Sequence, residues 1–252
     1  MPLSVVIITF NEEHNLPRTL ESVKWADEII VVDSLSTDRT VEIARTFGAK
    51  VFVEPWKGFA AQKNSAINKA TCDWILSIDA DEVVPSDLKL EILEALKKSV
   101  QPGSPDGYWV PRMNYILGRW MRHGGYWPDH KLRLFRRGKG HLPERAVHET
   151  IHVEGKLGFL REPLFHEPYP DLATYIEHMD RYSSLGAQMA VEKGWCGFSF
   201  INIVLRPMFT FIYNYFFRLG FLDGREGLLL HLYHSVYVSW KYAKVWELTR
   251  SK

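Results

Sequence analysis

Three carboxylates occupy four consecutive positions in the segment Asp79-Ala80-Asp81-Glu82. They follow residues 74–78, a run that is apolar except for Ser77 and that predicts a buried strand. Carboxylates this close repel one another and raise each other's pKa unless a cation lies among them. Oxygen ligands suit Mg²⁺ or Mn²⁺, which take one or two protein carboxylates and complete their coordination with substrate phosphates and water. The cluster therefore predicts a divalent-metal site, and a solvated acidic turn before a helix is the alternative.

A basic segment follows later in the chain, at residues 131–139. It contains Lys131, Arg133, Arg136, Arg137 and Lys139. Arginine side chains pair well with phosphates because their planar forks match the phosphate oxygens. The segment is expected to bind a nucleotide diphosphate or an anionic, phosphorylated acceptor; a solvated hairpin is the third interpretation.

The elements that must position these groups alternate along the first hundred residues. Strands are predicted at residues 5–9, 28–32, 50–53 and 74–78, with helices at 15–25, 37–47 and 58–69 between them. The second helix is expected to end at Gly48. This alternation predicts an α/β fold with a mostly parallel, Rossmann-like sheet and helices on both faces.

Polar residues follow three of these strands, in the segments 9–12, 33–38 and 79–82. Ligands of such sheets bind beyond the carboxyl ends of the strands, so the three segments are expected to converge on one site. Asp38 is expected to cap the helix that follows it. From residue 101 to 107 a loop rich in Pro, Gly and Ser ends this half, and a strand at 108–114 opens a less regular one.

The composition excludes some classes of protein. A chain of 252 residues that is 46% hydrophobic can form one large or two small domains. The formal net charge of +1 argues against nucleic-acid binding. Cys72 and Cys196 form no metal-ligand spacing, which favours a reduced, cytosolic setting. The N-terminus lacks the features of a signal peptide, so we expect a protein that is not exported.

An aromatic, apolar segment lies at residues 198–222, interrupted by Arg206-Pro207, Asn214 and Arg218. A bilayer-spanning helix needs about 20 apolar residues with few charges, and this segment is broken too often. It predicts a helical extension that lies at the membrane interface, with Lys241, Lys244 and Arg250 adding attraction to anionic lipid. A buried helical hairpin or the contact surface of a homo-oligomer is the alternative.

The segments 5–12, 31–38 and 78–82 resemble, in order and spacing, the family 2 glycosyltransferases with a GT-A fold. Residues 131–137, 147–149 and the aromatic tail resemble the lipopolysaccharide-core β-1,4-glucosyltransferase subgroup. The resemblance implies an inverting transferase that moves a sugar, glucose in this subgroup, from a UDP-sugar to a lipopolysaccharide-core or related glycolipid. It implies a divalent cation, Mg²⁺ or Mn²⁺, and a place at the inner face of the cytoplasmic membrane.

With the boundary drawn at the loop near residue 105, the chain is expected to comprise a nucleotide-sugar-binding half at 1–105, an acceptor-binding and catalytic half at 106–170 and a helical extension at 171–252. In the first part, Asp81 resembles the direct metal ligand, and Asp79 a residue that contacts ribose or the metal. Asp33 resembles the carboxylate that recognises the base. Four further residues are expected to line the donor pocket or reach the phosphates: Thr9, Asn11, Glu12 and Lys63. For Asn11 and Lys63, a turn residue and a solvated lysine are the respective alternatives.

The second half is expected to supply the base and a further metal ligand. Inverting transfer needs a general base within reach of the acceptor hydroxyl; Glu149 fits the family's late acidic motif, and Asp129 is the second candidate. His166 resembles a C-terminal histidine metal ligand, and a structural histidine bonded to a backbone partner is the alternative. His148 is expected to contact the diphosphate or take that ligand role. Gly118 to Trp127 resembles a flexible acceptor loop, with Trp120 and Trp127 for sugar stacking or core packing.

Two further functions are weighed against this one. A nucleotidyltransferase would need a glycine-rich phosphate loop after the first strand, which residues 9–12 lack. A non-catalytic nucleotide-binding or scaffold protein would keep the fold and lose acidic residues, yet Asp33, Asp79, Asp81 and Glu149 are all present.

Overall fold

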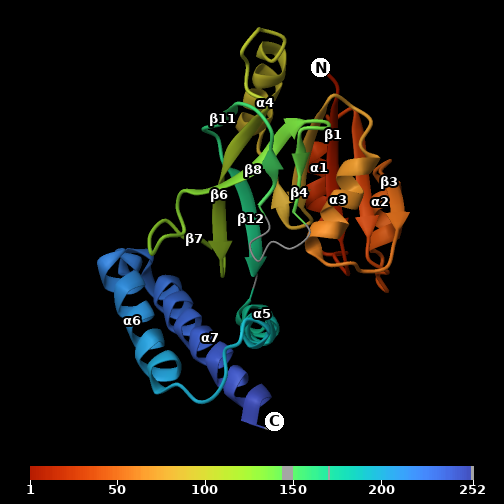
Figure 1. The fold of residues 1–252 in the computed structure, drawn as a ribbon. Coiled ribbons are helices and arrows are strands. Elements are labelled where there is room, and N and C mark those ends of the chain that lie inside the picture. The colour runs from red at the N-terminus through yellow and green to blue at the C-terminus, as the bar shows by residue number, and fades with distance from the viewer. Residues whose placement is uncertain (144–149, 170, 251–252) are drawn as a thin grey trace. The chain divides into compact units, whose positions relative to one another are not determined.

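A computed structural model describes residues 1–143, 150–169 and 171–250 (Figure 1). The chain divides into two compact units. The first comprises Met1–Arg112 and Asp129–His166, and the second comprises Met113–Pro128 and Glu167–Lys252. The division of the chain into a donor half, an acceptor half and a helical extension stays a prediction.

The first unit begins with the predicted alternation of strands and helices. The strands are β1 (Leu3–Thr9), β2 (Glu28–Asp33), β3 (Lys50–Val53) and β4 (Trp74–Asp79), and the helices between them are α1 (Leu16–Val23), α2 (Thr40–Thr46) and α3 (Phe59–Lys69). The strands are parallel, in the order β3-β2-β1-β4. All six residues of β2 are buried, as expected for a strand covered on both faces.

The sheet continues beyond β4 with antiparallel strands. In the described residues it has ten strands, and the order along its main path is β3-β2-β1-β4-β8-β6-β12-β5. The added strands are β8 (Asp129–Arg136), β6 (Gly107–Ile116), β12 (Leu164–Tyr169) and β5 (Glu82–Val83), with β7 (Arg119–Trp120) and β11 (Leu157–Phe159) paired to β6. A separate pair is formed by β9 (Gly140–His141) and β10 (His152–Val153).

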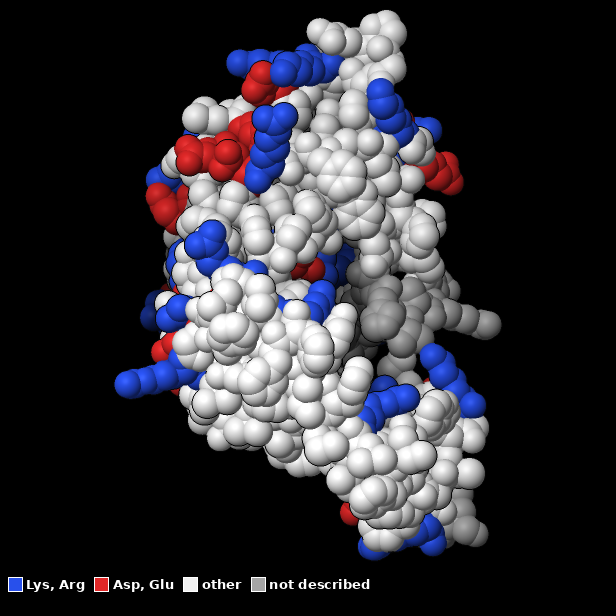
Figure 2. Space-filling view, turned by 90° about the vertical axis from the view of Figure 1, so that its left-hand side faces the viewer, with Lys and Arg blue, Asp and Glu red and all other residues white. Residues whose placement is uncertain are grey.

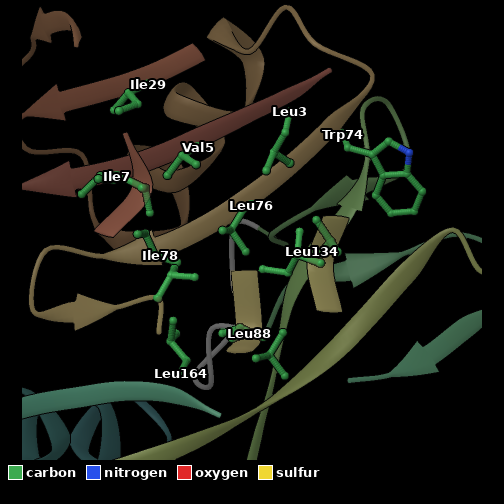
Figure 3. Packing of buried hydrophobic residues seen from close by; sticks show 14 of the residues in the cluster. Leu3, Val5, Ile7, Ile29, Trp74, Leu76, Ile78, Leu88, Leu134 and Leu164 are labelled. Carbon is green, nitrogen blue, oxygen red and sulfur yellow. The ribbon is translucent and has the colours of Figure 1, made fainter. Parts of the chain in front are cut away.

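The core of this unit lies on both faces of the sheet because side chains alternate along each strand. On one face, Val5 and Ile7 pack with Leu76 and Ile78 beneath α1, α2 and α4 (Ser86–Lys98) (Figure 3). On the other face, Val6 and residues of β2 pack against α3. The carboxyl ends of β1, β2 and β4 are thus fixed by a packed core at the edge where the polar segments begin.

The second unit is mainly helical. Its elements are α5 (Leu172–Glu192), the π-helical turns η1 (Ile201–Leu205) and η2 (Tyr213–Phe217) on either side of α6 (Arg206–Ile212), η3 (Gly220–Asp223) and α7 (Gly224–Arg250). Asp171 caps α5 by accepting a hydrogen bond from the backbone N–H of Thr174 at 2.8 Å. Ala187 and Ala190 of α5 pack against Val245 of α7. Among the described helices, none has the length and apolar character needed to cross a membrane.

Candidate active site

The acidic segment forms a tight turn between β4 and β5. Asp79 is the last residue of β4, and Ala80 and Asp81 make the turn before Glu82 begins β5. The hydroxyl of Thr19 in α1 donates a 2.7 Å hydrogen bond to the carbonyl of Ala80, and the Asp79 N–H donates to Glu82 Oε2 at 2.9 Å. The turn is therefore fixed from both sides, which sets the directions of its carboxylates.

Two cations neutralise Asp79. Nζ of Lys63 lies 2.7 Å from Asp79 Oδ1, and Nη2 of Arg133 lies 2.5 Å from Oδ2. Burial raises the pKa of Asp79, but Arg133 and Lys63 outweigh it and bring the pKa well below its ordinary value. Lys63 and Arg133 thus meet at Asp79, where a phosphate group could also be bound.

Arg133 belongs to a buried charge network that the sequence interpretation missed. Its Nη2 also lies 2.5 Å from Glu82 Oε1, and Glu82 is fully buried. Arg112 on β6 reaches the same Glu82 oxygen at 3.3 Å and bonds Asp129 Oδ2 at 2.8 Å. Arg112 has no sequence motif around it. The pairing of β6 with β8 places it opposite Asp129, and the order β6-β12-β5 in the sheet puts Glu82 on its other side.

Asp81 faces His166. Nε2 of His166 lies 3.4 Å from Asp81 Oδ2. The register of the sheet explains this proximity, because His166 on β12 pairs with Glu82 on β5, the residue after Asp81. Burial raises the pKa of Asp81, but His166 outweighs it, so the pKa lies below its ordinary value.

This pair fits one side of a divalent-metal site. Among residues 1–143, 150–169 and 171–250, no three His, Cys, Asp or Glu side chains come together as a complete set of metal ligands. Mg²⁺ and Mn²⁺ do not require one, since substrate phosphates and water fill the remaining positions. The donors here are a carboxylate oxygen and an imidazole nitrogen, which Mn²⁺ accepts. Asp81 and His166 are therefore the residues that would bind the ion, whereas Asp79 is already paired with two cations.

The loops after β1 and β2 are joined by hydrogen bonds. Asn11 has a φ of +54°, a conformation that Asn tolerates better than most residues, and its side-chain oxygen accepts from the Thr37 N–H at 2.8 Å. Its own N–H donates to Ser36 Oγ at 2.8 Å. Asp38 bonds the N–H groups of Thr40, at the start of α2, and of Glu13. The two loops form one polar rim at the carboxyl edge of the sheet.

Asp33 lies beneath this rim. It is fully buried, its Oδ1 accepts from the hydroxyls of Thr9 at 3.0 Å and Ser36 at 2.5 Å, and its Oδ2 accepts from the Ser36 N–H at 2.8 Å. Each carboxylate oxygen offers about two lone-pair sites, so Oδ2 retains one acceptor site. Thr9 and Asp33 thus come together as predicted, and the recognition of a base by Asp33 stays a prediction.

Glu12 lies between the rim and the acidic turn. Its carboxylate accepts a 3.0 Å hydrogen bond from the Asn15 side chain, and its N–H donates to Thr40 Oγ1. Burial is the main cause that raises its pKa to about 6; the Asn15 hydrogen bond lowers it, while repulsion from Asp81 adds to the rise. Glu12 therefore responds to the negative charge of the turn, as a residue lining the same site should.

Asp129, the second candidate for the base, is tied to cations. Arg112 contacts its Oδ2, and Lys131 Nζ lies 2.9 Å from its Oδ1. Burial raises the pKa of Asp129, but Arg112 and Lys131 lower it below the ordinary value. A carboxylate with a lowered pKa is a weaker proton acceptor, so this geometry does not favour Asp129 as the base.

The structure separates the two arginines that the sequence placed together. Arg136 pairs with Trp74 at the opposite end of β4 from Asp79, about 17 Å along the strand. There it donates to the Ser99 carbonyl at 2.5 Å and stacks on Trp74. Arg136 therefore does not join Arg133 at the acidic turn. Glu149 and His148 lie outside the described residues.

Comparisons with known proteins agree with this architecture. The family model described as glycosyl transferase family 2 matches residues 4–156. The lipopolysaccharide core biosynthesis glycosyltransferase LpsC of Rhizobium meliloti (strain 1021) is 32% identical over 259 residues, which cover 98% of this chain and 93% of that protein. The uncharacterized glycosyltransferase RT0209 of Rickettsia typhi is 30% identical, covering 98% of this chain and 87% of its own.

Solved structures share the fold at low sequence identity. The mannosyltransferase PcManGT from Pyrobaculum calidifontis, in complex with GDP-Man and Mn²⁺, has a TM-score of 0.56 at 14% identity, covering 96% of this chain and 86% of that one. TarS 1–349 of S. aureus in complex with UDP has a TM-score of 0.50 at 16% identity, covering 100% and 92%. These likenesses confirm the predicted GT-A fold with its helical C-terminal extension.

Proposed function

The chain belongs to glycosyl transferase family 2, and we propose that it transfers a sugar, glucose, from a UDP-sugar to a glycolipid of the lipopolysaccharide-core type with inversion at the anomeric carbon. A divalent cation assists the departure of the diphosphate. The observation that carries this proposal is the fixed turn at the carboxyl edge of β4, where Asp81 faces His166 and Asp79 faces Lys63 and Arg133.

The two sides of the turn suit a nucleotide diphosphate with its bound cation. Asp81 and His166 would bind the cation, which stabilises the negative charge that develops on the leaving diphosphate. Lys63 and Arg133 add positive charge from the protein itself, and both are largely buried, where an ion pair is less screened than at the surface. The rim formed by Asn11, Ser36 and Thr37 borders the same edge and would line the nucleoside.

The choice of donor and acceptor draws on the relatives. TarS has been crystallised with UDP and with UDP-GlcNAc, whereas PcManGT carries GDP-Man. The fold therefore accommodates more than one nucleotide, and the choice of a uridine nucleotide rests on the resemblance of Asp33 to the family's base-recognition carboxylate. The name of LpsC supports an acceptor in the lipopolysaccharide core. Such an acceptor would place the protein at the inner face of the cytoplasmic membrane.

Inversion requires one base and no covalent intermediate. Attack by the acceptor hydroxyl on the face opposite the diphosphate transfers the hydroxyl proton to a carboxylate. Because Asp129 is bonded to Arg112 and Lys131, Glu149 is the proposed base.

The experiment that tests the donor site is thermal unfolding of the purified protein with UDP, GDP and their sugar derivatives, with and without Mn²⁺. A ligand that binds only the native state raises the unfolding temperature. We expect stabilisation by UDP that requires Mn²⁺ and is lost in Asp81→Ala. Asp87→Ala, at an exposed carboxylate in the first turn of α4, is the matched control and should respond like the wild type.

Turnover is then measured as UDP release in the presence of a lipopolysaccharide-core acceptor, and the anomeric configuration of the product is read by NMR. Thermal stabilisation by GDP and not by UDP would show that the donor is a GDP-sugar. Nucleotide binding without turnover on any acceptor tried would favour the non-catalytic scaffold, and no response to any nucleotide would contradict the proposal.

A further inference from the structure

Residues 198–222 expose an unusual amount of apolar surface. The most exposed large side chains include Phe198, Ile201, Phe209 and Phe217, with Phe217 74% and Phe209 65% exposed. Single exposed apolar residues are ordinary, but contiguous patches of this kind mark interaction sites. In Figure 2, which faces the side where α6 lies in Figure 1, the lower half carries few charged side chains, and most of those are Lys or Arg.

This helical segment exposes apolar side chains where a water-exposed helix carries polar ones. Its covered side holds buried Pro207 and half-buried Thr210, Phe211 and Asn214. The opposite face carries Phe209 and Phe217 in the open. A helix on a soluble protein ordinarily buries its apolar face and exposes its polar one, so the exposed side here is built for an apolar environment.

The segment is fixed to the rest of the second unit. The hydroxyl of Ser239 in α7 donates to the carbonyl of Ile203 at 2.7 Å, and Arg206 bonds the hydroxyl of Tyr242. At the far end, buried Asp223 accepts from the N–H groups of Arg122 and His123 at 3.1 and 2.8 Å. The aromatic side chains are thus displayed on a folded support.

The charges of the segment distinguish two partners for this surface, a second copy of the chain and a lipid bilayer. Residues 198–222 contain Arg206 and Arg218 and no Asp or Glu. A two-fold contact between copies of the chain would set this patch against itself, bringing arginines together without a carboxylate from the segment to offset them. A bilayer with anionic headgroups offers acyl chains to the rings and phosphates to the arginines.

We propose that residues 198–222 are a docking surface for an anionic phospholipid bilayer, on which the segment lies without crossing it. Phe209 and Phe217 insert at the level of the headgroups and upper acyl chains, and Arg206 and Arg218 contact lipid phosphates. The inference rests on the proposed function only in that a glycolipid acceptor gives the contact a purpose; the surface itself is argued from its own residues.

The test is co-sedimentation of the full chain with vesicles of phosphatidylethanolamine and phosphatidylglycerol, compared with vesicles of phosphatidylcholine alone. We expect binding to the anionic vesicles that weakens with added salt. Phe209→Ser and Phe217→Ser should each weaken the partitioning roughly tenfold or more, the effect of withdrawing one aromatic ring from an apolar environment. Leu90→Ser, at a 63% exposed position of α4, is the matched control and should bind like the wild type.

Two results would overturn the inference: no binding of the wild type to either vesicle, or a dimer in solution that Phe209→Ser dissociates while vesicle binding is unchanged. Stabilisation by UDP is measured on the same preparations. Loss of vesicle binding with intact UDP stabilisation separates failure of the docking surface from failure of the donor site.

Discussion

Nζ of Lys63 on α3 lies 2.7 Å from Oδ1 of Asp79 at the end of β4, and Arg133 occupies the other carboxylate oxygen. A metal ion at Asp79 would have to displace Lys63 or Arg133, or share the carboxylate with them. Asp81, two positions further along the turn, contacts only the ionisable imidazole of His166 among the ion pairs of the described residues. We therefore propose Asp81 as the metal ligand of this turn and Asp79 as the residue that positions Lys63 and Arg133 on the diphosphate side.

Replacing His166 by glutamine should weaken the metal-dependent part of UDP binding. The amide removes an imidazole ligand but keeps a polar side chain beside Asp81. We expect at least about a tenfold loss, since even residues outside the ligand shell cost that much in metal affinity. Calorimetric titration with UDP and Mn²⁺ measures the change, and exposed His130→Gln on β8 is the control. Equal Mn²⁺ dependence in His166→Gln and wild type would remove His166 from the site.

Arg133→Met should destabilise the protein strongly. It leaves the carboxylates of Asp79 and Glu82 without their shared partner, and Glu82 is fully buried. Breaking a buried ion pair from one side costs about 3–5 kcal/mol. The free energy of unfolding is measured by urea denaturation, with Lys98→Met, at an exposed i,i+4 pair on α4, expected to cost less than about 1 kcal/mol. Similar losses for both variants would mean that the buried network contributes nothing special.

The pKa of Glu12, raised to about 6 from 4.5, predicts a pH dependence of stability. Between these values the folded protein binds a proton that the unfolded chain has released, so stability falls as pH rises from 4.5 through 6. The full cost above pH 6 is about 2 kcal/mol. Glu12→Gln should recover that amount at pH 7.5 in EDTA and flatten the curve, whereas Glu13→Gln should not. An unchanged pH profile in Glu12→Gln would show that Glu12 is not the group responsible.

Much of this architecture follows from the sequence because the first half is built from local patterns. The β-branched runs and helical spacings before residue 80 gave each strand and helix to within about three residues, the usual uncertainty of element ends. The polar segments after β1, β2 and β4 converge because parallel strands end at one edge. Lys63 reaches Asp79 for the same reason, since α3 follows β3 and begins at this edge, and Lys63 lies in its second turn.

The remainder depends on strand register, which the sequence does not reveal. Arg133 and Arg136 look like one basic cluster, but an odd separation on a strand sends two side chains to opposite faces. The antiparallel pairing of β8 with β4 then places Arg136 beside Trp74. Arg112 is placed opposite Asp129 by the pairing of β6 with β8, and it reaches Glu82 on β5, two strands away. No short motif indicates this contact between residues thirty positions apart.

Asp223→Ala should loosen the loop that contains Trp120 and Trp127. The Asp223 carboxylate bonds the N–H groups of Arg122 and His123 and lies 2.7 Å from His123 Nδ1. Its removal leaves these donors unpaired, at a cost of about 1–3 kcal/mol. We expect hydrogen exchange of residues 119–126 to accelerate and KM for the acceptor to rise, with UDP affinity unchanged. Asp180→Ala, at an exposed ion pair with Lys244, is the control; equal exchange in both variants would contradict the anchoring role.

The two candidates for the base predict opposite kinetics. Removing a general base lowers kcat by about 10²–10⁴ and leaves binding of the donor intact. Glu149→Gln should behave in this way and lose the acidic limb of the pH–rate profile. Asp129→Asn should lower stability by releasing Arg112 and Lys131, while kcat at saturating donor stays within about tenfold of the wild type, because a cation-bound carboxylate contributes little as a proton acceptor. Both variants are compared at matched folded fraction, with UDP binding measured in parallel. A collapse of kcat in Asp129→Asn alone would assign the proton transfer to Asp129 and require Arg112 and Lys131 to release it when the acceptor binds.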